Sequence, residues 1–299
     1  MTTKRKLAYI ALITTVIIWG VAFPFIKPAL DIISPLQYLY FRFLAAGIIS
    51  LPIFLWYYLK EQPKISYLIK VLFIELLGIT IPLYLLYEGL ARTSSLDASL
   101  LGSVGPIFIT LGGIWFLHER QSKREWQGMA LALLGSTILV VAPLFTGAID
   151  SPSSTTGNLL IMGYNLTYTI YALLGKHIYK TKPPLFLGSP TYLATALIYG
   201  LILSAKNSLP PISLLISNST ILMPVLYMAI PGGILAFALH LYAVSKIEVS
   251  EANLFTYLNG VIAIPAAYFL LGEKPTLFTL LAILIIAYGV YRAETRSSQ

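Results

Sequence analysis

Long apolar segments follow one another along the whole chain, separated by short polar breaks. Ten segments are found when hydrophobic runs are set against breaks of charge, Pro, Gly and Ser. Their expected bounds are 7–28, 35–57, 67–91, 97–117, 126–144, 158–178, 186–204, 220–244, 251–271 and 276–293. Helices of this length cross a hydrocarbon core of about 30 Å. The pattern therefore predicts an all-α integral membrane protein with ten transmembrane helices.

The composition supports a membrane protein and limits the chemistry. Hydrophobic residues make up 57% of the chain and charged residues 11%, whereas a soluble domain carries about 25% charged residues. The first apolar segment follows the basic run Lys4 to Lys6, but it is longer than a signal-peptide core and lacks a small-residue cleavage site, so we expect it to be retained. The chain has no Cys, which excludes disulfides, thiolate metal sites and iron–sulfur clusters.

Basic residues are distributed unevenly between the two sides that ten helices would define. One set of loops and both tails carries fifteen Lys and Arg residues, and the other set carries Lys27, Arg92, Lys206 and Lys274. Because the basic side of a membrane protein faces the cytoplasm, we expect both termini there and a multi-pass protein of the cell membrane, either inner or plasma. The net charge of +8 then reflects topology, and nucleic acid is not an expected partner.

The second half of the chain repeats the first. The stretch "SLDASLLGSVGPIFITLGGIWFLHE", ending at Glu119, aligns with "VSEANLFTYLNGVIAIPAAYFLLGE", ending at Glu273, and pairs Asp97 with Glu251. Upstream, "IIWGVAFPFIK" aligns with "LTYTIYALLGK". We therefore expect one repeat over 7–144 and another over 158–293. Because each repeat has five helices, an odd number, the two insert in opposite directions, as in many secondary transporters.

Several segments resemble a known family. They are "WGVAFPFIKP", "FRFLAAGII", "YEGLARTSSLDASLLGSVGPIFITLGGIWFLHER" and "LYAVSKIEVSEANLFTYLNGVIAIPAAYFLLGEKPT". They are similar to the paired domains of the EamA family in the drug/metabolite transporter superfamily, over nearly the whole chain. The resemblance implies a carrier of amino acids, their derivatives or other amphipathic metabolites and drugs, with no cofactor or metal. Tyr168 departs from it, where the second half often carries Trp, and so does Gly260, where Pro is frequent.

Charged residues inside apolar segments are candidates for function, because each costs about 2.5 to 3.5 kcal/mol to insert. Asp97 opens the fourth segment, where the helix dipole favours an acid. For Glu75 we expect a peripheral ion pair with Lys70 or the loop bases. Glu88 shares a helix face with Tyr84, so it either binds a substrate ammonium or carries a proton, or it pairs with Arg92 at i+4.

Arg42 lies about seven residues into the second segment, too deep for easy snorkelling. A basic residue at this "RF" position is common in the family that the chain resembles. Two roles remain open on the sequence alone. Arg42 either neutralises a substrate carboxylate or braces Glu88 in a buried pair.

Aromatic residues recur at helical spacing in equivalent parts of the two halves. Trp19 and Phe23 lie four apart in the first segment, while Tyr164, Tyr168 and Tyr171 share a face of the sixth. We expect these faces to line a central substrate cavity, although an interfacial belt or plain helix packing gives the same pattern. Weaker candidate members of the cavity are His240, Tyr257 and Asn259.

The motifs of rival functions are missing from the sequence. There is no HExxH, no GxSxG and no P-loop, which disfavours a membrane-embedded enzyme or an ATP-driven pump. A receptor, a structural protein or a channel stays open as the alternative. The sequence predicts a permease that exports small organic metabolites by alternating access, with a small molecule and the lipid bilayer as partners and a proton as candidate coupling ion.

Overall fold

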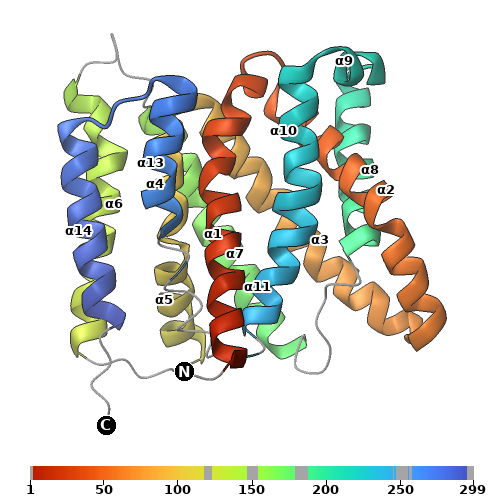
Figure 1. The fold of residues 1–299 in the computed structure, drawn as a ribbon, viewed down its shortest axis with the longest axis horizontal. Helices are drawn as coiled ribbons and strands as arrows, with labels where there is room; N and C mark the ends of the chain where they lie inside the picture. Colours follow the sequence, from red (N-terminus) through yellow and green to blue (C-terminus); the bar gives the residue numbers. More distant parts are fainter. Residues whose placement is uncertain are drawn as a thin grey trace.

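A computed structural model describes residues 3–117, 123–146, 154–178, 188–244, 246, 255 and 258–294, and over these ranges the chain forms helices and no strand. Figure 1 shows an elongated bundle in which α1 begins and α14 ends at the same end. The helices are α1 (Thr3–Leu30), α2 (Pro35–Glu61), α3 (Ile65–Arg92), α4 (Ser95–Ser103), α5 (Gly105–Leu117), α6 (Lys123–Thr146), α7 (Thr155–Ile178), α8 (Gly188–Ala205), α9 (Ile212–Ser217), α10 (Ser219–Ala229), the π-helix η2 (Ile230–Leu235), α11 (Ala236–Val244), α13 (Leu258–Leu271) and α14 (Leu277–Glu294).

All of these helices except α9 overlap the predicted apolar segments, and two of the segments are divided. The segment 97–117 holds α4 and α5, and the segment 220–244 holds α10, η2 and α11. Within the described residues, four helices are long and apolar enough, by length and composition, to cross a membrane: Arg5–Leu30, Pro35–Glu61, Ile65–Arg92 and Ser219–His240. Large apolar side chains face outward, such as Phe269 at 80% exposure, which suits a surface covered by lipid.

Local sequence explains where several helices begin and where one is distorted. Ser34 and Gln37 form a reciprocal capping box at the start of α2, with Pro35 in the first turn, where its missing N–H is not needed. Ser94 caps α4 by accepting a hydrogen bond from the Asp97 backbone N–H at 2.9 Å. In η2 the sequence Ile-Pro-Gly-Gly widens the helix into a π turn, since Pro231 cannot donate to the α-helical ladder.

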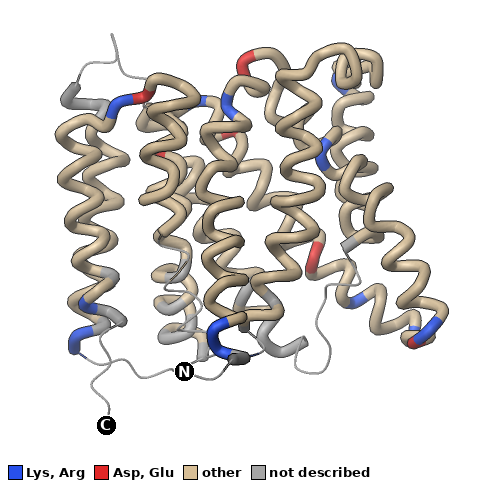
Figure 2. The backbone as a smooth tube through the Cα atoms, in the orientation of Figure 1, with Lys and Arg blue, Asp and Glu red and all other residues tan. Residues whose placement is uncertain are grey.

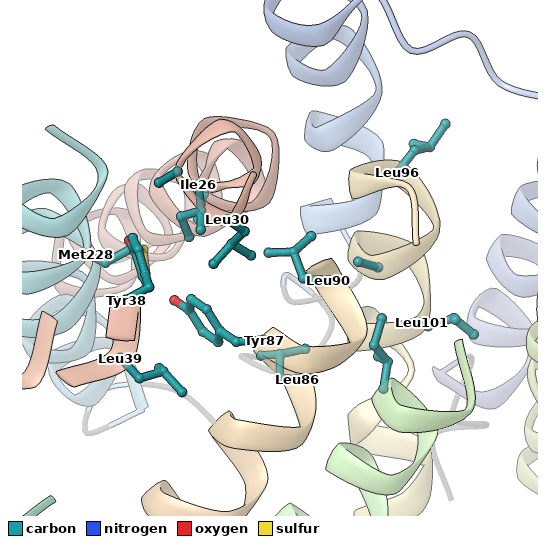
Figure 3. Packing of buried hydrophobic residues seen from close by; sticks show 14 of the residues in the cluster. Ile26, Leu30, Tyr38, Leu39, Leu86, Tyr87, Leu90, Leu96, Leu101 and Met228 are labelled. Carbon is teal, nitrogen blue, oxygen red and sulfur yellow. The ribbon is translucent and has the colours of Figure 1, made fainter. Parts of the chain in front are cut away.

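The helices of the first half pack mainly against helices of the second half. α2 runs along α8, α3 along α7 and α6 along α14, while α1 lies against α13, α10 and α11. Figure 3 shows part of the resulting core, where Tyr87 projects from α3 toward Tyr38 of α2, near Met228 of α10. The middle of the bundle is thus built from both halves of the chain.

Candidate functional site

Tyrosines of α7 form a row along one side of that helix. The ring centres of Tyr164 and Tyr168 are 5.7 Å apart, and those of Tyr168 and Tyr171 are 5.5 Å apart. The spacing of four and three residues places the rings on one face. The Tyr171 hydroxyl donates a hydrogen bond of 2.8 Å to Oε1 of Glu75 on α3. The last tyrosine of this row therefore contacts the Glu75 carboxylate.

Glu75 is buried, with 7% of its surface exposed. Glu75 accepts a hydrogen bond from Tyr171 across the helix interface, and Lys70, one of the partners expected for it, is exposed. The ion pair expected with Lys70 or the loop bases stays a prediction. Gly78 makes the Tyr171 contact feasible, since a Cβ atom at residue 78 would come within 2.1 Å of the Tyr171 ring. A glycine one turn from an intramembrane acid was the sequence signal for a close helix crossing at Glu75.

Arg42 of α2 is also buried, at 9% exposure. Its Nη1 donates a hydrogen bond of 2.6 Å to the Tyr87 hydroxyl, and the guanidinium carbon lies 5.2 Å from the centre of the Phe43 ring and 5.5 Å from that of Tyr87. Tyr38 stacks on Tyr87 at 5.3 Å and donates to the Pro224 carbonyl of α10 at 2.8 Å. Two aromatic rings therefore hold the guanidinium in place.

Arg42 does not brace Glu88, which was one of the two roles left open by the sequence. Glu88 forms its ion pair with Arg92, one helical turn further along α3, and Arg92 also donates to the Glu88 carbonyl at 2.8 Å. Tyr84, one turn earlier, is 37% exposed. The Glu88 carboxylate is therefore paired within α3. The Arg42 guanidinium has no carboxylate partner among the described residues.

Two tyrosines of α8 complete the surroundings of Arg42. Tyr192 and Tyr199 each contact the Phe43 ring, at 5.7 Å and 6.1 Å between centres. The charge of Arg42 acts on both of these tyrosines and on Tyr164 of the α7 row, and Tyr192 is also within the field of Glu75. The candidate site is therefore a set of tyrosines from α2, α3, α7 and α8, with a cation and a carboxylate among them. Four of these tyrosines were not predicted as site residues from the sequence: Tyr38, Tyr87, Tyr192 and Tyr199.

Known proteins match this chain along nearly its whole length. A model of the EamA-like transporter family matches residues 6–141 and again residues 155–293. The chain belongs to this family. An uncharacterized transporter of Archaeoglobus fulgidus is 25% identical over 298 residues, covering 97% of this chain and 98% of the relative. The uncharacterized transporter YdfC of Bacillus subtilis is 26% identical, covering 91% of this chain and 86% of the relative.

The fold of this EamA-like transporter also has a counterpart among solved structures. One crystal structure superimposes with a TM-score of 0.67 at 17% identity, covering 98% of this chain and 99% of the other. At that identity the likeness concerns the fold alone. Together with the family and the apolar helices, it describes an integral membrane protein of a transporter family.

The other predicted site residues of the described ranges that are not yet placed lie on α1 or close to it. Trp19 of this EamA-like transporter donates from Nε1 to the Gly232 carbonyl of η2 at 2.9 Å, and its ring centre is 5.7 Å from that of His240. Phe23 lies against α4, where a Cβ at residue 102 would be 3.7 Å from its ring. The buried Oδ1 of Asn259 has no hydrogen-bond partner in the described ranges. Tyr257, like Glu119 and Glu251, lies outside the described residues.

The polar segment between α3 and α4 joins several helices at one end of the bundle. Nζ of Lys27 donates to the carbonyls of Leu90 at 2.5 Å and Thr93 at 2.6 Å, where α3 ends. The Glu273 carboxylate accepts from the Ser95 backbone N–H at 3.1 Å and hydroxyl at 2.8 Å, and from the Leu96 N–H at 3.2 Å. As predicted, Asp97 lies in the first turn of α4. We call these contacts of Lys27 and Glu273 the end clamp.

Most charged residues of the described chain lie away from the middle of the bundle. Figure 2 shows Lys, Arg, Asp and Glu concentrated at the two ends of the bundle, with few between them.

An apolar groove of about 100 Å³ opens between α2, α3 and α8, lined by Phe54, Leu68, Ile69, Leu72, Pro190 and Thr191. Phe54 is 12 residues from Arg42 along α2, or about 18 Å in a helix. The groove is therefore separate from the charged tyrosine cluster and offers no charge for orienting a substrate.

Proposed function

We propose that this protein is a secondary transporter that exports small organic metabolites, such as amino acids or related amphipathic compounds, by alternating access through a central cavity. The observation that carries the proposal is the buried cluster of Arg42, Glu75 and their tyrosines. Charged groups inside a transmembrane bundle usually mark a substrate or ion pathway. Here they lie on α2, α3, α7 and α8, helices of both halves of the chain.

An inverted repeat would let one central site open to either side. Two observations support such a repeat over 7–144 and 158–293, with ten transmembrane helices in all. The family model matches the chain twice. The helix contacts are also reciprocal, because α3 of the first half packs on α7 of the second, and α10 and α11 of the second pack on α1 of the first.

The end clamp suggests which face is closed in the described conformation. Glu273, in the second half, holds the start of α4 in the first half through three hydrogen bonds. With both termini in the cytoplasm, as the distribution of basic residues favours, the clamp lies on the outer face. Release of substrate to the outside then requires the clamp to separate, and the cell membrane is the proposed location.

The partners in this proposal are one small-molecule substrate, the lipid bilayer and a coupling proton. Glu88 was the first candidate for the proton, but it forms an ion pair with Arg92 near the end of α3. Glu75 is the better candidate because it is buried and receives the Tyr171 hydroxyl. Replacement Glu75→Gln should then abolish the response of transport to an imposed pH gradient, whereas Glu88→Gln should leave that response in place.

Counterflow in proteoliposomes tests the transporter proposal directly. Vesicles are preloaded with a mixed pool of unlabelled amino acids, and entry of labelled phenylalanine is followed with protein-free vesicles as the control. A carrier accumulates the label transiently above its equilibrium level, because exchange is faster than net loss of the unlabelled pool. No accumulation with folded protein would overturn the amino-acid proposal, and no accumulation with any metabolite pool would favour a receptor, a structural protein or a channel.

A further inference from the structure

The Arg42 guanidinium has far more hydrogen-bonding capacity than the described part of the protein uses. A guanidinium carries five N–H donors in a rigid planar fork. Arg42 donates one hydrogen bond, to the Tyr87 hydroxyl. At 9% exposure, bulk water does not solvate the rest of the group freely. A buried charge without a partner is unfavourable, so this arrangement is expected only where an external group completes it.

The surroundings of Arg42 indicate which group that is. Tyr87 and Phe43 lie beside the guanidinium, and the hydroxyls of Tyr164, Tyr192 and Tyr199 come within its field. These side chains add aromatic surface and neutral hydroxyls, and they add no second cation. One positive charge matches one negative charge, and a planar fork matches a planar carboxylate in a bidentate pair.

Glu75 restricts the ligand further. Its charge acts on Tyr168 and Tyr192, and the latter is also within the field of Arg42. A ligand with a second carboxylate would bring that group near the Glu75 carboxyl, while Arg42 offers a single positive charge. The aromatic rings around Arg42 instead favour an apolar or aromatic body.

We propose that Arg42 binds the carboxylate of a transported monocarboxylate whose apolar or aromatic body lies against the tyrosines. The inference rests on the proposed transport function and adds the substrate class. Tyr87 is a positioning residue, because its hydroxyl and ring fix the guanidinium without meeting the ligand charge. Neutral amides of the same shape are rejected, since they leave the Arg42 charge uncompensated.

Binding to the full-length protein in detergent tests this inference independently of transport. The probes are matched pairs of a carboxylate and its amide: 3-phenylpropionate, indole-3-acetate, octanoate and L-phenylalanine, each against the corresponding amide, with phenylsuccinate as a dicarboxylate. Affinity is measured by ligand-dependent thermal stabilisation for wild type, Arg42→Gln and Arg42→Lys. Lys60→Gln, at the exposed end of α2, removes the same charge from the same helix and serves as the matched control.

The expected result is that at least one carboxylate binds wild type and Lys60→Gln about 10- to 100-fold more tightly than its amide, as for loss of a hydrogen bond to a charged group. Arg42→Gln should lose this preference, and Arg42→Lys should keep it in weakened form, which decides the matter if the Gln variant does not fold. Phenylsuccinate should bind less tightly than 3-phenylpropionate.

Three results would overturn the inference: no carboxylate in the panel binds, each carboxylate binds no better than its amide, or Arg42→Gln retains the preference. Failure of the transporter proposal would look different. In that case carboxylate binding would depend on Arg42 while counterflow of the same compounds was absent.

Discussion

Lys27 and Arg42 are both basic residues within apolar helices, but the protein treats them in opposite ways. Lys27 donates to two carbonyls at the end of α3 and is within the field of Asp31 and Glu273. Arg42 is more deeply buried, makes a single hydrogen bond to Tyr87, and has no carboxylate partner in the described ranges. A paired charge stabilises the fold, whereas an unpaired one must be explained by function.

The comparison also separates two regions of the bundle. At the end clamp, the polar groups of Lys27 and Glu273 bind backbone groups at the end of α3 and the start of α4 that have no partner within their own helix. Near Arg42 the neighbouring polar groups are tyrosine hydroxyls, and Tyr38 and Tyr199 donate theirs to backbone carbonyls. The polar groups of the clamp region satisfy one another, whereas on our proposal a ligand completes the Arg42 region.

Replacing the clamp lysine should have the largest effect on stability. Lys27→Met leaves the Leu90 and Thr93 carbonyls without their donor, and we expect the free energy of unfolding to fall by about 2–4 kcal/mol. The measurement is the midpoint of SDS unfolding, with the exposed Lys206→Met as control. An unchanged midpoint for Lys27→Met would break the comparison, because it would show that the clamp does not stabilise the fold.

The contact between α3 and α7 is the next most sensitive point. Gly78→Ala places a Cβ atom against the Tyr171 ring, so the ring must move away from Glu75, and we expect a loss of about 1–3 kcal/mol. Counterflow should fall together with stability. Gly163→Ala on α7 is the matched control, since its Cβ would lie 3.6 Å from Leu85, an ordinary contact. Equal effects of the two substitutions would argue against a special role for the Tyr171 contact.

Substitution of Arg42 should raise the free energy of unfolding instead of lowering it. Arg42→Met removes an unpaired buried charge, and we expect the ligand-free protein to gain about 0.5–2 kcal/mol, as when a functional site is sacrificed for stability. The same unfolding assay measures this change. A loss of stability as large as that of Lys27→Met would mean that Arg42 has a structural partner.

The smallest expected effect concerns the other member of the clamp. Glu273→Gln keeps an oxygen acceptor for the Ser95 and Leu96 donors and removes the negative charge, so the loss should be about 0.5–1.5 kcal/mol. Glu273→Ala should cost more, because all three donors lose their acceptor. If the two substitutions have equal effects, hydrogen bonding by Glu273 is not what closes this end.

The fold class and part of the site were predictable because they depend on local sequence. Apolar length located the helices, and the spacing of Tyr164, Tyr168 and Tyr171 placed their rings in one row. The acid Asp97 in the first turn of α4 followed from helix-end chemistry. Each of these features is determined within one helix.

The features that were missed depend on contacts between helices. The sequence pointed to Lys70 or the loop bases as partners of Glu75, and it did not predict the hydrogen bond from Tyr171, 96 residues further on. Tyr87 was missed because its partners Tyr38 and Arg42 lie on α2. Hydrophobic periodicity contains no information on which faces of different helices meet.

The central claim is that Arg42 lacks an ionic partner because the substrate supplies it. The most direct measurement is the unfolding midpoint of wild type and Arg42→Met as the concentration of a carboxylate bound by the wild type is raised. We predict that the variant is at least as stable without ligand and that the two curves cross, because only wild type gains stability from the carboxylate. Parallel curves, or a variant that is less stable throughout, would contradict the claim.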